Sequence, residues 1–166
     1  MSSPANGTAD PERNPSPPSG PWRAERVATA ADRIVILGGG TRGREIARAA
    51  AAVGTVHHLD ARESTVDGPE GYTARHVPDV ESAAGLATVS FEPGDTVIVA
   101  TPSDRRNLLI TQHVRTKFDV DRVLVVVNDP QNHPALELPG VACLCLSTLL
   151  GDAVAGAISG AEEKSA

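Results

Sequence analysis

The sequence predicts an α/β protein in which helices cover both faces of a mostly parallel, six-stranded, doubly wound sheet. Three observations lead to this fold class. Short apolar runs alternate with amphipathic segments, several of these runs are apolar throughout, and the links between them are short. Continuously apolar strands are typical of parallel strands buried on both faces, and strand–helix alternation is typical of a doubly wound sheet.

Six segments have the composition expected of strands. One of them, 73–77 (TARHV), is more polar than the others. The remaining five are 33–37 (RIVIL), 55–59 (TVHHL), 95–101 (DTVIVAT), 122–127 (RVLVVV) and 141–146 (VACLCL). Helices are expected at 42–53, 79–88, 103–117, 130–138 and 148–158. The order of elements is therefore that of linked strand–helix units.

The ends of three predicted helices carry recognisable signals. In the first helix, apolar residues at helical spacing form one stripe, and Gly54 stands where the helix would end. Ser103 can cap the third helix, and Asp129 followed by Pro130 is a good cap and first-turn pair for the fourth. The stripe of the first helix consists of Ile46, Ala50 and Val53.

Composition divides the chain into one predicted domain and two tails. Residues 1–30 hold six of the thirteen prolines and show no periodicity, which is typical of a disordered tail. Residues 31–158 are expected to form a single domain, because a chain of 166 residues is too short for two domains of average size. Residues 159–166 are expected to be a flexible C-terminal tail.

Charge, hydropathy and cysteine content narrow the classes of function. The chain has a net charge of −6, which argues against nucleic acid as a partner. Neither a signal peptide nor a stretch of roughly 18 uncharged apolar residues is evident, so we expect a cytoplasmic protein without direct membrane insertion. Cys143 and Cys145 would share one face of a strand, and they predict buried side chains rather than a metal site.

A glycine-rich motif follows the first predicted strand. Residues 38–43, GGGTRG, fit the spacing G-x-G-x-x-G, with a strand before them and a helix opening within them. In such a motif Gly38 permits a tight turn, Gly40 lets the backbone approach a pyrophosphate, and Gly43 lets the helix pack closely on the strand. The amides of the first helical turn then point at the phosphates. The motif and its context predict a Rossmann-like nucleotide site.

An acidic residue supports this interpretation. Asp60 ends the second predicted strand about 20 residues after the glycines, where a carboxylate accepts hydrogen bonds from ribose hydroxyls. Asp60 favours NAD or an adenosine nucleotide over a ligand with a 2′-phosphate. Arg62 leaves NADP as an alternative, and it is also compatible with a solvated loop position. His57 and His58 lie within the same strand and are expected to be structural.

The end of the fourth strand should complete the site. Ligands of open parallel sheets lie at the carboxyl ends of the strands, near the point where strand order reverses. The small and hydroxylated residues Ala100, Thr101 and Ser103 would leave room there for a ribose or a phosphate. A catalytic set does not stand out, since the only tyrosine, Tyr72, is followed four positions later by His76 rather than by Lys. A binding function is favoured.

Several stretches together resemble a known family. They are VILGGGTRGREIA, HHLDAR, DTVIVATPSDRRNLLI and, most specifically, DRVLVVVNDPQNHPALELPGV followed by STLLGDAVAGAI. Across residues 33–158 the chain resembles the nucleotide-binding N-terminal domain of the Trk potassium-uptake regulators, the KTN or RCK domain. The C-terminal regulatory subdomain of longer family members has no counterpart in this sequence.

The resemblance implies a cytoplasmic regulatory subunit that binds NAD(H), ATP or ADP and is not an enzyme. Its partner would be a membrane potassium transporter or channel subunit, which would hold it peripherally at the membrane. The helix at 148–158 would form a homodimer or higher homo-oligomer. The implied nucleotide contacts, with Arg62 added from the reasoning above, are Gly38, Gly40, Thr41, Arg42, Gly43, Asp60, Asp79, Ala100, Thr101 and Ser103.

Two departures from the family pattern keep alternatives open. Pro78 replaces the glycine that often precedes Asp79, and Val126 stands where an arginine is common. One alternative is a small NAD-dependent oxidoreductase, such as a tetrapyrrole-type dehydrogenase. Another is a non-catalytic interaction module with a degenerate cleft.

Overall fold

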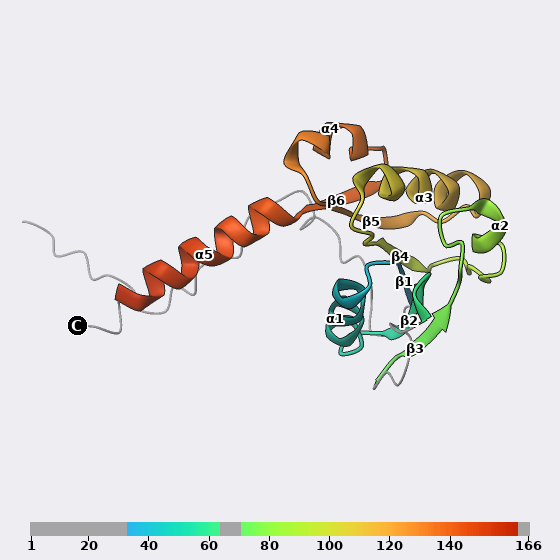
Figure 1. Cartoon of the computed structure of the whole chain (residues 1–166), viewed down its shortest axis with the longest axis horizontal. Coiled ribbons are helices and arrows are strands. Elements are labelled where there is room, and N and C mark those ends of the chain that lie inside the picture. The colour runs from blue at the N-terminus through green and yellow to red at the C-terminus, as the bar shows by residue number, and fades with distance from the viewer. Residues whose placement is uncertain (1–32, 64–70, 163–166) are drawn as a thin grey trace, which may run out of the picture.

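The computed structural model describes residues 33–63 and 71–162. Its core is one six-stranded sheet in the order β3-β2-β1-β4-β5-β6, and every neighbouring pair is parallel (Figure 1). The predicted α/β class and doubly wound order are thus confirmed, and the predicted tail at 1–30 lies outside the described residues. The strands are β1 (Arg33–Leu37), β2 (Thr55–Asp60), β3 (Thr73–His76), β4 (Thr96–Val99), β5 (Arg122–Val127) and β6 (Val141–Cys145).

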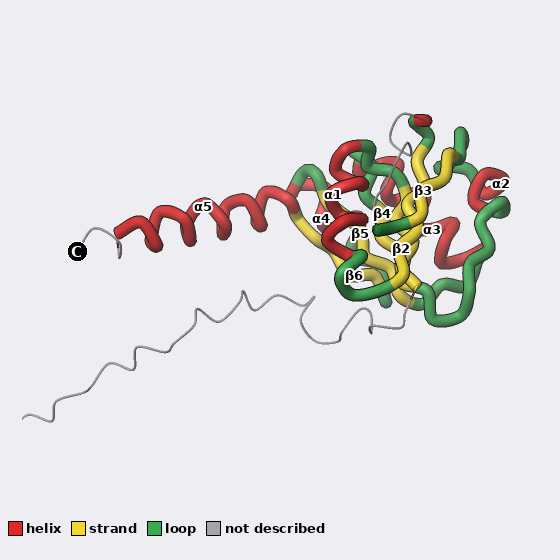
Figure 2. Tube along the Cα trace, turned by 90° about the horizontal axis from the view of Figure 1, so that it is seen from below, coloured by secondary structure: helices red, strands yellow, loops and turns green. Residues whose placement is uncertain are grey.

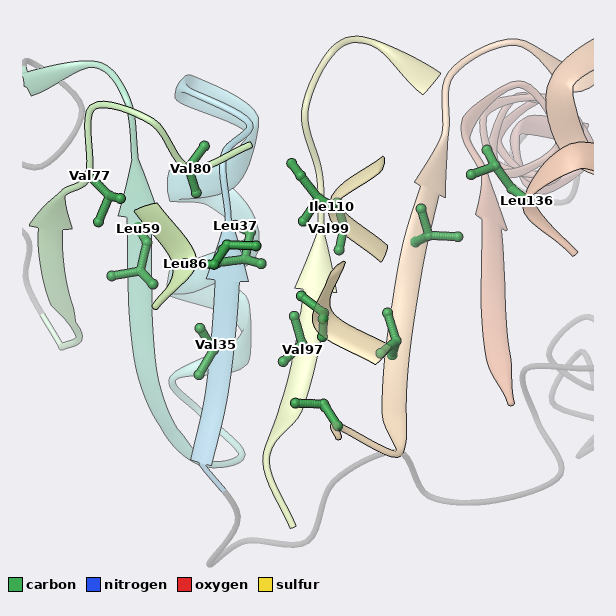
Figure 3. Packing of buried hydrophobic residues seen from close by; sticks show 14 of the residues in the cluster. Val35, Leu37, Leu59, Val77, Val80, Leu86, Val97, Val99, Ile110 and Leu136 are labelled. Carbon is green, nitrogen blue, oxygen red and sulfur yellow. The ribbon is translucent and has the colours of Figure 1, made fainter. Parts of the chain in front are cut away.

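Helices cover the two faces of the sheet unequally. They are α1 (Thr41–Ala50), α2 (Ala83–Leu86), α3 (Asp104–Lys117), the 3₁₀ turn η3 (Pro130–Asn132), α4 (His133–Leu136) and α5 (Leu146–Glu162). On one face, Leu86 of α2, Ile110 of α3 and Leu136 of α4 pack in the larger buried cluster (Figure 3). On the other face, Ala47 of α1 packs in a smaller cluster.

Alternation along β1 explains the two clusters. Val35 and Leu37 point into the larger cluster, whereas Ile34 and Ile36 point into the smaller one. Successive strand residues face opposite sides of a sheet, so a strand with apolar residues at every position must be covered on both sides. This alternation is the physical reason why the continuous apolar runs in the sequence predicted a sheet covered on both faces.

The first helix ends earlier than predicted. It runs from Thr41 to Ala50 and is followed by a turn, so Val53 lies beyond the last helical turn and is 54% exposed. The prediction that Val53 belongs to the apolar stripe is wrong, because the buried positions of α1 are Gly43 and Ala47. Gly54 is also not the helix end, since Ala51 is the residue that caps α1.

Two other predicted helices are shorter or interrupted. The segment 79–88 is helical only at Ala83–Leu86, because Ser82 accepts a hydrogen bond from Gly85 N and starts the helix there. The segment 130–138 divides into η3 and α4, and Pro134 stands in the first turn of α4, where its missing N–H is tolerated. The predicted caps Ser103 and Asp129 are confirmed, since they accept hydrogen bonds from Arg106 N and Gln131 N.

The last helix extends away from the sheet. α5 begins directly after β6 and projects from the body of the domain (Figures 1 and 2). Three of its apolar residues, spaced four apart, are exposed: Leu150 by 66%, Val154 by 49% and Ile158 by 63%. Within the described residues, no helix has the length and hydropathy to cross a membrane.

The two cysteines lie on one face of β6, as alternation predicts. Both side chains are half-buried and pack against the larger cluster. Cys143 Sγ lies 3.2 Å from the carbonyl oxygen of Leu136. Burial raises the pKa of the Cys143 thiol, which keeps it protonated at neutral pH.

Candidate functional site

The strand order reverses between β1 and β4, and the loops after these two strands meet. The loop after β1 is the glycine motif, and the loop after β4 begins at Ala100. A Cβ atom on Gly38 would lie 2.7 Å from Thr101 Cγ2, so the loops are in direct contact. The structure therefore brings together the two segments that the sequence predicted to form one site.

The three consecutive glycines all have positive φ angles, of 72°, 97° and 54°. Neighbouring protein atoms crowd the first two: a Cβ on Gly39 would lie 2.9 Å from the Ala100 carbonyl oxygen. At Gly40, by contrast, the nearest atom to a Cβ is Arg62 Nη1 at 3.7 Å, the end of a flexible side chain. Gly40 is thus the glycine at which another molecule can approach the backbone.

Asp60 holds this part of the loop in place. Asp60 is buried, and its two carboxylate oxygens accept hydrogen bonds from the amides of Gly40 and Arg62, both at 2.8 Å. Burial alone would raise the pKa of Asp60, but the nearby His58 imidazole and the two amides outweigh it and lower the pKa to about 2. The residue is therefore a carboxylate at any physiological pH.

The last glycine of the motif lies against a histidine. Gly43 is buried in the first turn of α1, and a Cβ there would lie 2.5 Å from His58 Nε2 and would also collide with the Gly38 carbonyl oxygen. The prediction that Gly43 allows close packing of helix on strand agrees with this contact. The partner in the contact is His58 of β2, which the sequence did not indicate.

Arg42 and Thr41 occupy different surroundings. Thr41 is exposed at the first position of α1. The guanidinium of Arg42 donates a hydrogen bond to Asn128 Oδ1 at 2.6 Å, which links α1 to the loop after β5. Arg42 thus lies beside the glycine loop but is engaged with a residue 86 positions away in the sequence.

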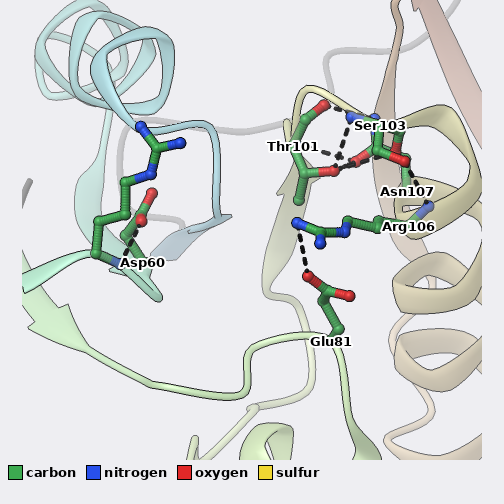
Figure 4. A network of polar contacts seen from close by, with 7 residues as sticks. Asp60, Glu81, Thr101, Ser103, Arg106 and Asn107 are labelled. Carbon is green, nitrogen blue, oxygen red and sulfur yellow. Dashed lines mark hydrogen bonds and ion pairs between the residues drawn. The ribbon is translucent and has the colours of Figure 1, made fainter.

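A buried amide joins the ends of β4 and β5. Asn107 of α3 is 0% exposed; its Oδ1 accepts hydrogen bonds from Thr101 N and Thr101 Oγ1, at 3.0 and 2.5 Å. Its Nδ2 donates to the carbonyl oxygen of Thr101 (Figure 4) and to that of Val126. Val126 itself is buried, so the position where an arginine is common faces the core here.

Asp104 organises the loop after β5. Its carboxylate accepts hydrogen bonds from Asn128 N, Asp129 N and Asn132 Nδ2, at 2.7 to 2.9 Å. Burial opposes ionisation, but these hydrogen bonds outweigh it and lower the pKa of Asp104. Sequence reasoning missed Asp104 and Asn107 as site residues. The sequence signal for both was their spacing. Two short polar residues lie three positions apart, about one helical turn, in the helix that follows a strand end.

The remaining predicted site residues lie around the edge. Asp79 is exposed in the loop after β3, and its carbonyl oxygen accepts a hydrogen bond from Ser82 N. Ser103 caps α3 beside Thr101. An ion pair of 3.1 Å between Arg106 and Glu81 lies across from Asp60 (Figure 4). No group of three potential metal-ligating residues occurs within the described ranges.

Comparison with known proteins identifies similar sequences. The TrkA-N domain model matches residues 34–144. The Trk system potassium uptake protein TrkA of Mycobacterium tuberculosis, in the strains CDC 1551 / Oshkosh and ATCC 25618 / H37Rv, is 28% identical over 107 residues. The match covers 60% of this chain and 46% of each relative, so the chain spans about half the length of the curated relatives it matches.

Solved structures share the fold. The NAD(P)-binding domain of an exopolyphosphatase-related protein from Archaeoglobus fulgidus is similar with a TM-score of 0.65 and 23% identity, over 78% of this chain and 98% of that one. A xanthine dehydrogenase from Bacillus halodurans is similar with a TM-score of 0.50 and 14% identity, over 64% of this chain and 33% of that one. At these identities the likeness is one of fold.

Proposed function

The chain belongs to the TrkA-N domain family, and from this premise we propose that it is a nucleotide-sensing regulatory subunit of potassium transport. Its ligand is NAD(H), ATP or ADP, bound where the strand order reverses. The observation that carries the proposal is the pairing of Gly40 with Asp60. An open glycine backbone and a fixed carboxylate stand side by side, as a pyrophosphate and its ribose require.

The two halves of the site have separate tasks in this proposal. Gly38 shapes the turn, Gly40 lets the phosphates approach the backbone, and the amides of the first turn of α1 from Thr41 to Gly43 receive the phosphates, because backbone amides at a helix N-terminus attract anions. Asp60 accepts hydrogen bonds from the ribose through the lone pairs that its two amide partners leave available. Arg62 beside Gly40 adds a positive charge near the phosphates.

The other side of the site receives the rest of the ligand. In this proposal Ala100, Thr101 and Ser103 form the edge of the site at the end of β4, and Asp79 lies on the adenine side. Thr101 is rigidly held, since Asn107 engages its amide, hydroxyl and carbonyl.

Regulation requires a partner that responds to the bound nucleotide. We propose a membrane potassium transporter or channel subunit, with the protein acting in the cytoplasm as a homodimer or higher homo-oligomer. The support is the curated relative, named as a Trk system potassium uptake protein, and the exposed apolar stripe of α5. We further propose that the protein is not an enzyme, because no catalytic set was evident in the sequence.

Isothermal titration calorimetry tests the proposal directly. NAD, NADH, NADP, NADPH, ATP and ADP are titrated separately into the full chain at low and at molar potassium chloride. Binding of an adenine nucleotide without turnover supports a sensor and identifies its signal. Absence of binding in every titration would contradict the proposal. Steady change in nicotinamide absorbance with a reducible substrate would favour an oxidoreductase instead.

A further inference from the structure

His58 lies beneath the glycine loop. It is a β2 residue two positions before Asp60, and its side chain is 0% exposed. Its Nε2 atom lies 3.0 Å from the Gly38 carbonyl oxygen and 3.6 Å from Asp60 Oδ2. One imidazole nitrogen therefore faces both the first glycine of the motif and the acid of the site.

The surroundings decide which nitrogen carries the proton. A carbonyl oxygen and a carboxylate only accept hydrogen bonds, so Nε2 must be the donor. Nδ1 is buried and has no hydrogen-bond partner within the described residues. A proton on Nδ1 would be left there without an acceptor, which is costly in a buried position. The geometry therefore points to Nε2 as the nitrogen that carries a proton and donates it to the Gly38 carbonyl oxygen.

Packing alone does not call for a histidine here. Two other interior-facing residues of β2, Val56 and Leu59, are apolar and equally well buried, and the ring of Tyr72 lies 6.3 Å from the His58 ring. An apolar side chain would fill the same volume but could not donate to Gly38. The buried imidazole thus stands where its hydrogen bond reaches the glycine loop.

We propose that His58 is a positioning residue of the nucleotide site, which acts by donating its Nε2–H to the Gly38 carbonyl. Fixing this carbonyl sets the plane of the peptide that enters the glycine turn, and so the direction of the amides that face the phosphates. His58 does not touch the ligand. This inference rests on the proposed nucleotide binding and adds to it a residue outside the glycine motif.

Three variants separate donation from packing. His58→Gln can place an amide N–H near the position of Nε2, whereas His58→Leu fills the space without a donor. His57→Leu alters the neighbouring half-buried histidine on the opposite face of β2 and serves as the matched control. Calorimetry with the nucleotide that binds the native chain best measures affinity, and thermal melts without nucleotide confirm that each variant is folded.

We expect His58→Leu to bind about tenfold more weakly, the scale of one buried hydrogen bond, with His58→Gln and His57→Leu within about threefold of the native chain. Equal affinity in all four proteins overturns the inference and leaves the proposed function intact. Equal losses in His58→Leu and His58→Gln also overturn it, because they indicate packing. Absence of binding by the native chain refutes the proposed function itself.

A spectroscopic measurement keeps the inference testable if His58→Leu fails to fold. Two-bond ¹⁵N–¹H correlation spectra of the native chain distinguish the two imidazole tautomers. We expect a proton on Nε2 of His58, whether or not nucleotide is present. A spectrum with the proton on Nδ1 overturns the inference, because Nε2 could then not donate to Gly38.

Discussion

The amide of Gly40 donates a hydrogen bond of 2.8 Å to Asp60 Oδ2. This bond joins the loop after β1 to the end of β2, and it connects the most open glycine of the motif to the carboxylate expected to hold a ribose. Asp60 thus shapes the loop in addition to the ribose contact proposed for it. Changes at either residue are expected to affect both nucleotide affinity and local stability.

The first prediction concerns the pH dependence of stability. The pKa of Asp60 is lowered from its ordinary 3.8 to about 2. The ionised carboxylate therefore stabilises the folded state above about pH 4, and this stabilisation is lost as the pH falls towards 2. The shift corresponds to about 2 kcal/mol. Urea denaturation of the native chain and Asp60→Asn should give free energies of unfolding that differ at pH 6 and converge in acid. A difference that stays constant down to pH 2 would contradict the prediction.

The second prediction separates backbone strain from lost ligand space. Gly40 has a φ of 54°, and Gly94, near the start of β4, has a φ of 93° with no atom within 4 Å of a Cβ. Gly40→Val and Gly94→Val should each lose about 1–3 kcal/mol of stability through strain. Only Gly40→Val should lose nucleotide affinity, by at least about tenfold, because its methyl groups occupy the phosphate position. Native affinity in Gly40→Val would remove the glycine loop from the site.

The third prediction concerns Gly43, whose φ angle is not positive. Gly43→Ala should cost about 1–3 kcal/mol, because the new methyl group collides with the Gly38 carbonyl and lies 2.5 Å from His58 Nε2. Gly156→Ala, in α5 with no atom within 4 Å of a Cβ, is the control. Alanine favours helix, so this control should leave stability unchanged or raise it by up to about 1 kcal/mol. Equal effects in thermal melts would contradict the proposed collision.

The fourth prediction concerns association through α5. Leu150, Val154 and Ile158 are spaced four apart and therefore lie along one side of the helix. Replacing all three with serine should convert the native oligomer to a monomer in sedimentation equilibrium, because the exposed apolar stripe is lost. Asp152→Asn lies about half a turn away and should leave the assembly unchanged. A native chain that sediments as a monomer would refute the proposed homo-oligomer.

The strands were predictable because their signal is local. A run of apolar residues is enough to indicate a buried parallel strand, and β1 and β5 have the predicted bounds. Helix ends were less predictable, since Val53 and Ile46 are both apolar and only the position of the last turn decides which of them packs against the core. The glycine spacing and Asp60 indicated the site because backbone conformation and strand ends follow from local sequence.

The sequence by itself determined the strand–helix order, the place of the glycine turn and the acid at the end of β2. These follow from residue type and spacing over a few neighbouring positions. Tertiary structure alone decided that Arg42 bonds Asn128, that Asp104 gathers the loop after β5, and that His58 lies under Gly38. The physical reason is that the residue type determines which hydrogen bonds a side chain can donate or accept. The partner in each bond depends on which distant segments the sheet brings within hydrogen-bond distance.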